Sequence, residues 1–454
     1  MEYLIGLDIG TSSAKGVLLT TDGEVIHSAR GAFPYDRTSD GRVELKPEAY
    51  LSVCLETTRE LALAAKGGTI KGLCASSASG NLVLLDKENK PLTNIIGWQD
   101  GRVTNEAKEL LSDLDKDTFY RQIGWPYGFR FMPLSQLCYM KQHTPELLER
   151  CGTAAMSTEY LYYALTGKWG ISPSAGITYY LIDQQKGAYI APLLTRLGLH
   201  KAQLPPILPC GTVLGGVQEE MAARCGLPAG TPVILGSFDH PSAARGAGVL
   251  EEGELLLSCG TSWVAFFPVK DKEKGYAAGA LVDPFLSPQG CYGVMSSVAS
   301  LSGRLEYYTH RYIDASDQAY SKLSELARQS VPGANGLQID LLSEPDDGKL
   351  TSCSKADVAR AVMEGAVRLL KERLDTLAQH GITATRAVMV GGPSADPYWL
   401  ELIGQMCHLE VKVVHGAYAG AVGAAILAGI GTGIYKDEKE AQARFQERER
   451  NIKP

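Results

Sequence analysis

One short pattern occurs twice in this chain, and it limits the folds that the chain can adopt. Residues 3–20 read YLIGLDIGTSSAKGVLLT, two apolar strands on either side of the turn Gly10-Thr11-Ser12. Residues 253–267 read GELLLSCGTSWVAFF, again two apolar strands, on either side of Gly260-Thr261-Ser262. Two such units about 250 residues apart predict a duplicated architecture with one hairpin in each half.

The remaining sequence alternates between strand-like and helix-like segments, which predicts an α/β fold. Further strands are expected at 70–75, 82–86, 231–235, 386–390 and 410–414. Helices are expected at 47–66, 104–114, 134–142, 158–165, 354–379, 398–406 and 420–428. Residues 241–248 suit a hinge or a packed short helix, and the charged tail, 435–454, suits a solvated terminal helix.

Charge and hydropathy exclude some classes of protein. The chain of 454 residues has 44 Lys+Arg against 51 Asp+Glu, a net charge of −7, without a basic cluster. It is therefore not expected to bind nucleic acid, which requires clustered Lys and Arg. The uncharged stretch 416–435 approaches the length of a membrane span, but its six glycines favour a tightly packed core. No membrane association is expected.

The cysteine pattern and the N-terminus indicate where the protein resides. Ten cysteines are spread singly, without a C-x-x-C pair or metal-ligand spacing, as is typical of reduced thiols in the cytoplasm. The N-terminal MEYLIGLDIG lacks the basic region of a signal peptide. We therefore expect a cytoplasmic protein.

The first hairpin carries groups that suit a nucleotide phosphate. Asp8 ends a buried strand and could hold Mg²⁺. The backbone N–H groups and hydroxyls of residues 10–13 (Gly10, Thr11, Ser12, Ser13) could bind phosphate oxygens, with Lys15 adding positive charge. An ordinary hairpin with glycine present for its φ is the alternative for one such turn. The second turn favours the phosphate interpretation, because paired hairpins that clamp a nucleotide are typical of actin-like ATPases.

Motifs over essentially the whole chain resemble those of the FGGY carbohydrate kinase family, and they come in the family's order. They are GLDIGTSSAKGVLL, GRVELKPEAY, LVLLDKENKPLTNIIGWQDGR, TPVILGSFDHPSAARGAGVL, ELLLSCGTS, GGPSADPYWLELIGQMCHLEVKV and AGAVGAAILAGIGTG. The resemblance implies two actin-like (ribonuclease H-like) α/β domains flanking a deep cleft. Residues 1–247 would supply the sugar site and catalytic base, and residues 248–454 would supply most of the ATP site. The oligomeric state is left open, with a homodimer as one candidate.

The resemblance also implies roles for individual residues. Asp239 matches the family's catalytic base, which accepts the proton of a sugar hydroxyl as its oxygen attacks the γ-phosphorus, and it joins Asp8 as a metal ligand. A structural helix N-cap is the alternative for Asp239. The remaining nucleotide-binding candidates are Gly260, Thr261 and Ser262 in the second hairpin, and Gly391, Gly392, Ser394 and Asp396 on the adenine side.

The sugar-binding segments depart most from the family pattern. Trp98, Asp100 and Arg102 match its W-x-D-x-R, although Trp98 could instead be a core residue. Xylulose kinases usually carry Gln-Met-His-Gly where this chain has Ala78, Ser79, Gly80 and Asn81, and the last three are candidate sugar contacts. They usually carry Asn where this chain has His240, which is a candidate sugar contact with a packed structural histidine as the alternative. Glycerol kinases carry an Arg-Glu pair that is absent here. Arg130 is a further candidate sugar contact.

The missing Met and His side chains leave volume that a differently configured sugar could occupy, or that Phe238 or Phe129 could refill. D-xylulose is therefore expected either not to be the preferred acceptor or to be bound through different contacts.

We interpret the chain as an ATP- and Mg²⁺-dependent kinase that phosphorylates a hydroxyl of a ketose or related polyol in carbohydrate catabolism. Two alternatives share the fold. One is an actin-like ATPase without a small acceptor, which would not explain Asp239 or the W-x-D-x-R motif. The other is a non-catalytic sugar sensor, against which the intact Asp8 and Asp239 argue. The identity of the sugar and the hydroxyl that is phosphorylated stay open.

Overall fold

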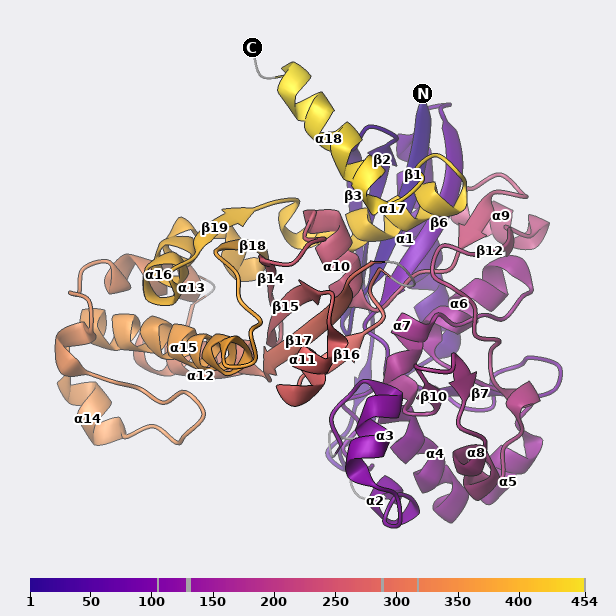
Figure 1. Ribbon diagram of the computed structural model, residues 1–454, viewed down its shortest axis with the longest axis horizontal. Helices are drawn as coiled ribbons and strands as arrows, with labels where there is room; N and C mark the ends of the chain where they lie inside the picture. The colour runs from indigo at the N-terminus through magenta and orange to yellow at the C-terminus, as the bar shows by residue number, and fades with distance from the viewer. Residues whose placement is uncertain (104–105, 128–131, 287–289, 317, 453–454) are drawn as a thin grey trace. The chain divides into compact units, whose positions relative to one another are not determined.

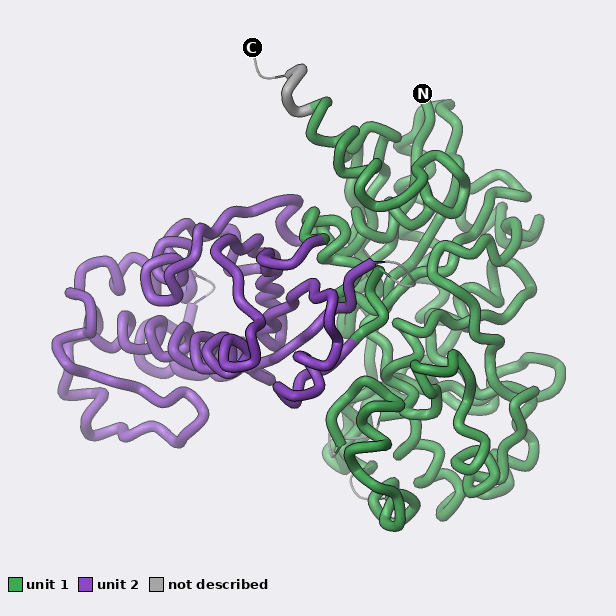
Figure 2. The backbone as a smooth tube through the Cα atoms, viewed as in Figure 1, with its two compact units in different colours: residues 1–250, 283–288, 418–454 green, residues 251–282, 289–417 purple. Residues whose placement is uncertain are grey.

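The chain folds into two compact units (Figure 2). The computed structural model describes residues 1–103, 106–127, 132–286, 290–316 and 318–452, with side chains up to residue 448. Residues 1–250, 283–288 and 418–454 form the first unit, and residues 251–282 and 289–417 form the second. The first unit thus includes 418–454, which the sequence-based division placed in the C-terminal domain. The assignment of the sugar and ATP sites to separate domains stays a prediction.

A six-stranded sheet in the order β12-β13-β6-β1-β2-β3 forms the centre of the first unit (Figure 1). Its strands are β1 (Glu2–Ile9), β2 (Ser13–Thr20), β3 (Val25–Ala32), β6 (Thr69–Ser77), β12 (Val213–Gly216) and β13 (Pro232–Ile234). β1 and β2 form the predicted antiparallel hairpin, while β6 runs parallel to both β1 and β13. The carboxyl ends of β1, β6 and β13 therefore meet at one edge of the sheet.

The second unit repeats this pairing in a sheet of order β16-β17-β15-β14-β18-β19. Its strands are β14 (Glu254–Cys259), β15 (Trp263–Val269), β16 (Leu281–Asp283), β17 (Tyr292–Val298), β18 (Arg386–Gly391) and β19 (Glu410–Val413). β14 and β15 form an antiparallel hairpin that β17 extends, and β18 runs parallel to β14 as β6 does to β1. This confirms the duplicated architecture that the two repeated hairpins predict.

Helices and short strands complete both units. In the first unit the helices are α1 (Pro47–Ala64), α2 (Glu106–Leu110), α3 (Lys116–Ile123), α4 (Met132–His143), α5 (Pro145–Arg150), α6 (Ser157–Thr166), α7 (Pro173–Gly176), α8 (Ala191–Leu197), α9 (Glu219–Cys225), α10 (Asp239–Ala247), α17 (Ala419–Gly431) and α18 (Glu438–Ile452). Its short strands are β4 (Asp36–Arg37), β5 (Val43–Leu45), β7 (Val83–Leu85), β8 (Ile95–Ile96), β9 (Thr153–Ala155), β10 (Ile182–Asp183) and β11 (Ala188–Tyr189). The second unit has α11 (Lys272–Ala277), α12 (Leu301–Tyr312), α13 (Ala319–Ala327), α14 (Asp347–Ser352), α15 (Lys355–Ala378) and α16 (Pro397–Cys407).

Glycines let helix α17 pack at backbone contact inside the first unit. A Cβ atom on Gly423 would lie 1.7 Å from the carbonyl oxygen of Ser242 in α10. On Gly6 of β1 it would lie 1.8 Å from the carbonyl oxygen of Ala421. The glycine-rich stretch is thus a packed core helix, as the sequence predicts. Among the described residues, no helix is long and apolar enough to cross a membrane.

The solvated terminal helix predicted for the tail is wrong for its first half. Tyr435, Ala441 and Phe445 are 1, 0 and 6% exposed and belong to the same apolar cluster as α17. Glu438 pairs with the buried Arg245 of α10, with 3.0 Å between the guanidinium Nε and the carboxylate. Because Ala441 and Phe445 are four residues apart, they lie on one face of the helix. The many charged residues around them made this apolar face hard to recognise in the sequence.

Candidate active site

Two carboxylates lie near the carboxyl end of β1. Asp8 is opposite Lys15 on β2 and Ser76 on β6. The hydroxyl of Ser76 donates a hydrogen bond of 3.1 Å to Asp8 Oδ1. Desolvation, together with the nearby Asp239 carboxylate, raises the pKa of Asp8 to about 6, against the opposing effects of Lys15, Ser76 and His240. Asp8 pairs with Ser76, and the next residue, Ser77, bridges Phe238, the neighbour of Asp239. The structure therefore brings Asp8 and Asp239 together, although they are 231 positions apart in the chain.

Asp239 is the first residue of α10 and keeps its carboxylate partly in solvent. Its side chain is 25% exposed. Oδ1 accepts a hydrogen bond of 2.7 Å from the backbone N–H of His240 and lies 3.8 Å from His240 Nε2. The N-cap of the helix is Phe238, so the alternative of Asp239 as a structural N-cap is wrong. A fixed carboxylate beside a second one suits a general base next to a cation site.

The tips of both hairpins contain a glycine that the protein alone does not require. Gly10 donates its N–H to the carbonyl of Ser13 at 3.0 Å. Neither Gly10 nor Gly260 has a positive φ. A Cβ atom would find its first neighbour at 3.4 Å for Gly10 and at 4.0 Å for Gly260. The alternative of a glycine placed for its φ is therefore wrong. A Cβ atom would meet only ordinary van der Waals contacts at either glycine, and the close approach that a glycine backbone allows suits a phosphate group.

Two serines that sequence reasoning missed support the second hairpin. The hydroxyl of Ser302 donates to the carbonyl of Gly260 at 2.5 Å, and its N–H donates to the carbonyl of Thr261 at 3.2 Å. The N–H of Ser300 donates to the hydroxyl of Ser262 at 3.1 Å. A signal was present in the run of small hydroxyl residues where β17 ends and α12 begins.

The predicted adenine-side turn adjoins the second hairpin because β14 and β18 are parallel neighbours. Gly391 pairs with Cys259 and has φ 101°. A Cβ atom there would lie 2.2 Å from the carbonyl oxygen of Cys259. Ser394 donates its hydroxyl to the carbonyl of Gly391 at 2.7 Å.

Two residues of this turn differ in how open they are. The carboxylate of Asp396 caps α16 by accepting from the N–H of Tyr398 at 2.9 Å, and it also accepts from the hydroxyl of Ser324. Gly392, unlike Gly391, has open space where a Cβ atom would be. Direct nucleotide contact by Asp396 stays a prediction.

On the predicted sugar side, Trp98 connects the W-x-D-x-R motif to the first hairpin. Its indole N–H donates to the hydroxyl of Thr11 at 3.0 Å. Asn81 holds the start of α6, accepting from the N–H of Ser157 at 2.7 Å and donating to its hydroxyl at 3.0 Å. Ser79 is buried and bonded to Ser77. These partners position the loop, and contact with a sugar stays a prediction for each residue.

The structure shows what occupies the space beside Gly80, the position where xylulose kinases usually carry His. Gly80 has φ 86°, and a Cβ atom there would lie 2.5 Å from Met132 Sδ and 3.3 Å from Trp98 Cβ. Met132 from α4 therefore refills this volume. Phe238 instead contacts the rings of Trp125 and His240, with centroids 6.2 and 5.5 Å away. Phe129 and Arg130 lie outside the described residues.

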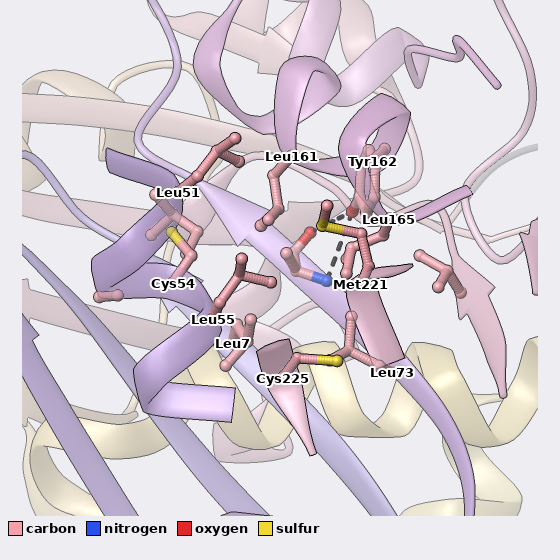
Figure 3. Packing of buried hydrophobic residues seen from close by; sticks show 14 of the residues in the cluster. Leu7, Leu51, Cys54, Leu55, Leu73, Leu161, Tyr162, Leu165, Met221 and Cys225 are labelled. Carbon is pink, nitrogen blue, oxygen red and sulfur yellow. Dashed lines mark hydrogen bonds between the residues drawn. The ribbon is translucent and has the colours of Figure 1, made fainter. Parts of the chain in front are cut away.

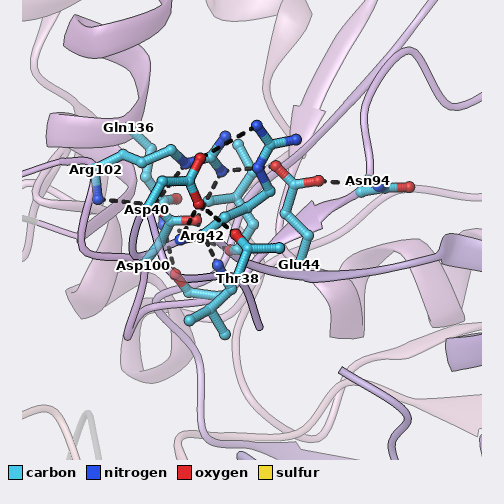
Figure 4. Close-up of polar contacts among 11 residues, drawn as sticks. Thr38, Asp40, Arg42, Glu44, Asn94, Asp100, Arg102 and Gln136 are labelled. Carbon is cyan, nitrogen blue, oxygen red and sulfur yellow. Dashed lines mark hydrogen bonds and ion pairs between the residues drawn. The ribbon is translucent and has the colours of Figure 1, made fainter. Parts of the chain in front are cut away.

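Asp100 is buried and fully engaged by protein donors (Figure 4). Its oxygens accept from the N–H of Val43 at 2.9 Å and from Nε and Nη2 of Arg102 at 2.9 and 2.7 Å. Burial alone would raise the pKa of Asp100, but the hydrogen bonds from Arg102 and Val43 lower it. Arg102 also pairs with Glu44 at 2.6 Å. Asp100 and Arg102 of the W-x-D-x-R motif thus connect the turn that contains them to β5. A sugar contact by Asp100 stays a prediction.

Comparison with known proteins places the chain in a family. Residues 3–246 match the N-terminal domain of the FGGY family of carbohydrate kinases, and residues 276–432 match its C-terminal domain. The xylulose kinase of Bacillus subtilis is 25% identical over 98% of this chain and 91% of its own length. The L-xylulose/3-keto-L-gulonate kinase of Escherichia coli is 27% identical over 100% of this chain and 93% of its own. The autoinducer-2 kinase of Salmonella typhimurium is 26% identical over 100% of this chain and 90% of its own length.

Solved structures agree on the fold. The xylulose kinase of Rhodospirillum rubrum superimposes with a TM-score of 0.85 at 25% identity, covering 97% of this chain and 92% of that one. The glycerol kinase of Plasmodium falciparum with ADP gives a TM-score of 0.85 at 16% identity, with 98 and 92% coverage. The whole-length match to carbohydrate kinases does not favour an actin-like ATPase without an acceptor or a non-catalytic sensor. The chain belongs to the FGGY family of carbohydrate kinases and is an ATP-dependent sugar kinase with the family's two actin-like domains.

Proposed function

We propose that this kinase transfers the γ-phosphoryl group of ATP to a hydroxyl of a ketose or related polyol in carbohydrate catabolism, with Asp239 as the general base. The observation that carries the proposal is the pair of carboxylates, Asp8 and Asp239, brought together where β1 ends and α10 begins. Asp239 accepts the proton of the attacking hydroxyl, and the N–H of His240 holds its carboxylate in place.

The two hairpins stabilise the charge of the transferred group. We assign the phosphates to the hairpin of Gly10, Thr11, Ser12, Ser13 and Lys15 and to that of Gly260, Thr261 and Ser262. The room beside Gly10 and Gly260 supports this assignment. The adenosine is assigned to the turn of Gly391, Gly392, Ser394 and Asp396, which adjoins the second hairpin.

The residues at the carboxylate pair fit Mg²⁺. Desolvation of Asp8 and repulsion between Asp8 and Asp239 raise the pKa of Asp8, and a cation would relieve the repulsion. Among the described residues there is no group of three or more His, Cys, Asp or Glu side chains that could hold a metal. Mg²⁺ suits such a site because it commonly takes one or two carboxylates together with substrate phosphates. Bound there, it would neutralise phosphate charge.

The sugar is assigned to Trp98, Asp100, Arg130 and His240 with the loop of Ser79, Gly80 and Asn81. His240 supports this assignment, since its ring is 22% exposed and adjoins the carboxylate of the base. Relatives named for xylulose and for L-xylulose or 3-keto-L-gulonate support a ketose. Because neither Gly80 nor Met132 supplies the hydrogen-bonding ring of the His that xylulose kinases usually carry, we expect D-xylulose not to be strongly preferred.

The compartment and assembly are proposed on more general grounds. None of the ten cysteines is joined in a disulfide, and seven of them are buried, as suits a protein of the reducing cytoplasm. A homodimer stays a prediction.

The proposal is tested by measuring ADP release with ketopentoses, ketohexoses, tetroses and polyols, and without an acceptor. Turnover should require an acceptor, and D-xylulose should not exceed every other sugar by a large factor in kcat/KM. Asp239→Asn should keep its fold and ATP binding and lose about 10²–10⁴-fold in turnover. Asp375→Asn, on the exposed face of α15, is the matched control. Near-normal turnover by Asp239→Asn would remove Asp239 from the mechanism.

A further inference from the structure

The parallel pairing of β6 with β13 continues beyond the end of β13 to an isolated bridge, and a β-bulge lies between them, directly before the catalytic segment. Leu73 pairs with Val233 and Cys74 with Ile234. The next bridge joins Ser77 to Phe238, so three residues on one strand oppose two on the other. Such a bulge interrupts the ladder, and it redirects the side chains that follow it.

The two backbones approach closely at this bulge. A Cβ atom on Gly236 would lie 1.9 Å from the carbonyl oxygen of Ala75. Both residues are buried, so backbone groups that lose their ladder partners here cannot be satisfied by bulk water.

The hydroxyl of Tyr162, from α6, enters the bulge and supplies the missing partners. It donates to the carbonyl of Ala75 at 2.6 Å and accepts from the N–H of Gly236 at 2.9 Å. The N–H of Ala75 also points to it, at 3.3 Å. Tyr162 is 1% exposed, and its ring lies among apolar residues including Leu161 and Leu165 (Figure 3).

Each of the joined backbones leads to one of the two carboxylates. Ala75 is followed by Ser76, which donates to Asp8. Gly236 is followed by Ser237, whose hydroxyl accepts from Nη1 of Arg245 at 3.0 Å, then by Phe238 and Asp239. Tyr162 thus connects two segments whose relative position sets the distance between Asp8 and Asp239.

We propose that Tyr162 is a positioning residue for phosphoryl transfer, whose hydroxyl holds the bulge between β6 and β13 so that Asp239 is aimed beside Asp8. The inference rests on the proposed role of Asp239 as base. Tyr162 contacts neither carboxylate and acts through the backbones of Ala75 and Gly236.

Tyr162→Phe tests this role, because it keeps the ring and removes the hydroxyl. The N–H of Gly236 and the carbonyl of Ala75 then lose a buried partner, and the segment before Asp239 can shift. A displacement of about 1 Å can lower the rate about 10²-fold, so kcat should fall by about ten- to a hundredfold. The KM values for ATP and sugar should stay near those of the wild type, because neither binding site is altered.

Tyr189→Phe is the matched control. Tyr189 is also buried, and its hydroxyl donates to the carbonyl of Pro205 at 2.7 Å, but it lies on β11. Both variants should lower the melting temperature by a similar amount, while only Tyr162→Phe should lower kcat. Unchanged kcat in Tyr162→Phe, or an equal loss in Tyr189→Phe, would overturn the inference.

A measurement on the wild type does not depend on whether the variant folds. The amide hydrogen of Gly236 should exchange only through global unfolding, and fast local exchange would contradict the role of Tyr162. Asp239→Asn in the same assay separates the two proposals. If that variant retains turnover, the proposed base is wrong; if it is inactive while Tyr162→Phe is fully active, only the present inference is wrong.

Discussion

At the scale of single residues, glycines are present in this protein for different reasons. Gly423 is required by packing, because its missing Cβ lets α17 approach α10. Gly391 is required by its positive φ as well as by the neighbouring strand. Gly10 has neither reason, and the phosphate site that we propose for the first hairpin would supply a different one.

Gly10→Ala should therefore affect binding without harming the fold. Its φ is compatible with alanine and there is room for the methyl group, so the free energy of unfolding should be unchanged or rise by about 0.4–1 kcal/mol. The KM for ATP should rise about tenfold or more, which is about 1.4 kcal/mol of binding. Thermal denaturation and ATP titration of the rate measure the two effects.

Gly423→Ala serves as the contrast, and it should destabilise the fold because its Cβ would lie 1.7 Å from a carbonyl oxygen. A wild-type KM for ATP in Gly10→Ala would remove the first hairpin from the phosphate site.

Glu159 makes stability depend on pH. It is 1% exposed, its Oε2 has no hydrogen-bond partner, and burial raises its pKa from 4.5 to about 8. A carboxyl group whose pKa rises on folding binds an extra proton in the native state. Its contribution to the free energy of unfolding is therefore full below about pH 4.5 and is lost as the pH rises toward 8.

Glu159→Gln cannot titrate, so its melting temperature relative to the wild type should increase between pH 5 and pH 8. One pKa unit corresponds to about 1.4 kcal/mol, and the relative gain should be on the order of 1–3 kcal/mol. Melting curves at several pH values measure it. A difference that is constant with pH would show that Glu159 is not neutral in the folded protein.

At the scale of elements, the apolar pattern and the turn residues were sufficient to predict a helix or strand whose burial depends on its own sequence. Helix α6 is predicted at 158–165, and it spans Ser157–Thr166, where Gly167 ends it at φ 71°. Helix α10, expected as a hinge or a packed helix, is a buried helix, because small residues allow contact with α17. Helix α18 differs from its prediction, because two apolar residues on one face outweigh many charges.

At the scale of the whole molecule, the first unit is discontinuous in the sequence. The chain leaves it after Leu250, returns briefly at residues 283–288, and returns again near the C-terminus with α17 and α18. Helix α17 contributes Ala421, Val422 and Ile426 to a core cluster that also contains Leu4 of β1 and Ile234 of β13. Residues 1–250 by themselves would expose this side of the sheet to water.

A fragment of residues 1–250 is therefore expected not to fold cooperatively, since burial contributes about 25 cal/mol per Å² of apolar surface. Joining residues 418–454 to the fragment through a flexible linker should restore a cooperative transition. Circular dichroism and urea denaturation distinguish the two chains. A cooperative transition for 1–250 alone would show that α17 is dispensable for the core.

Local patterns in the chain were enough to predict the α/β class, the two hairpins, most of the elements and the family. Strand alternation, helical periodicity and turn glycines reflect burial and backbone geometry over a few residues, and these can be recognised without knowing the neighbours. The meeting of Asp8 with Asp239, the bulge held by Tyr162 and the filling of the space beside Gly80 by Met132 depended on tertiary packing. These features bring together residues that are distant in the sequence. Their contacts depend on how the strands pair and how the side chains fill space, and neither can be predicted from the sequence pattern of a short segment.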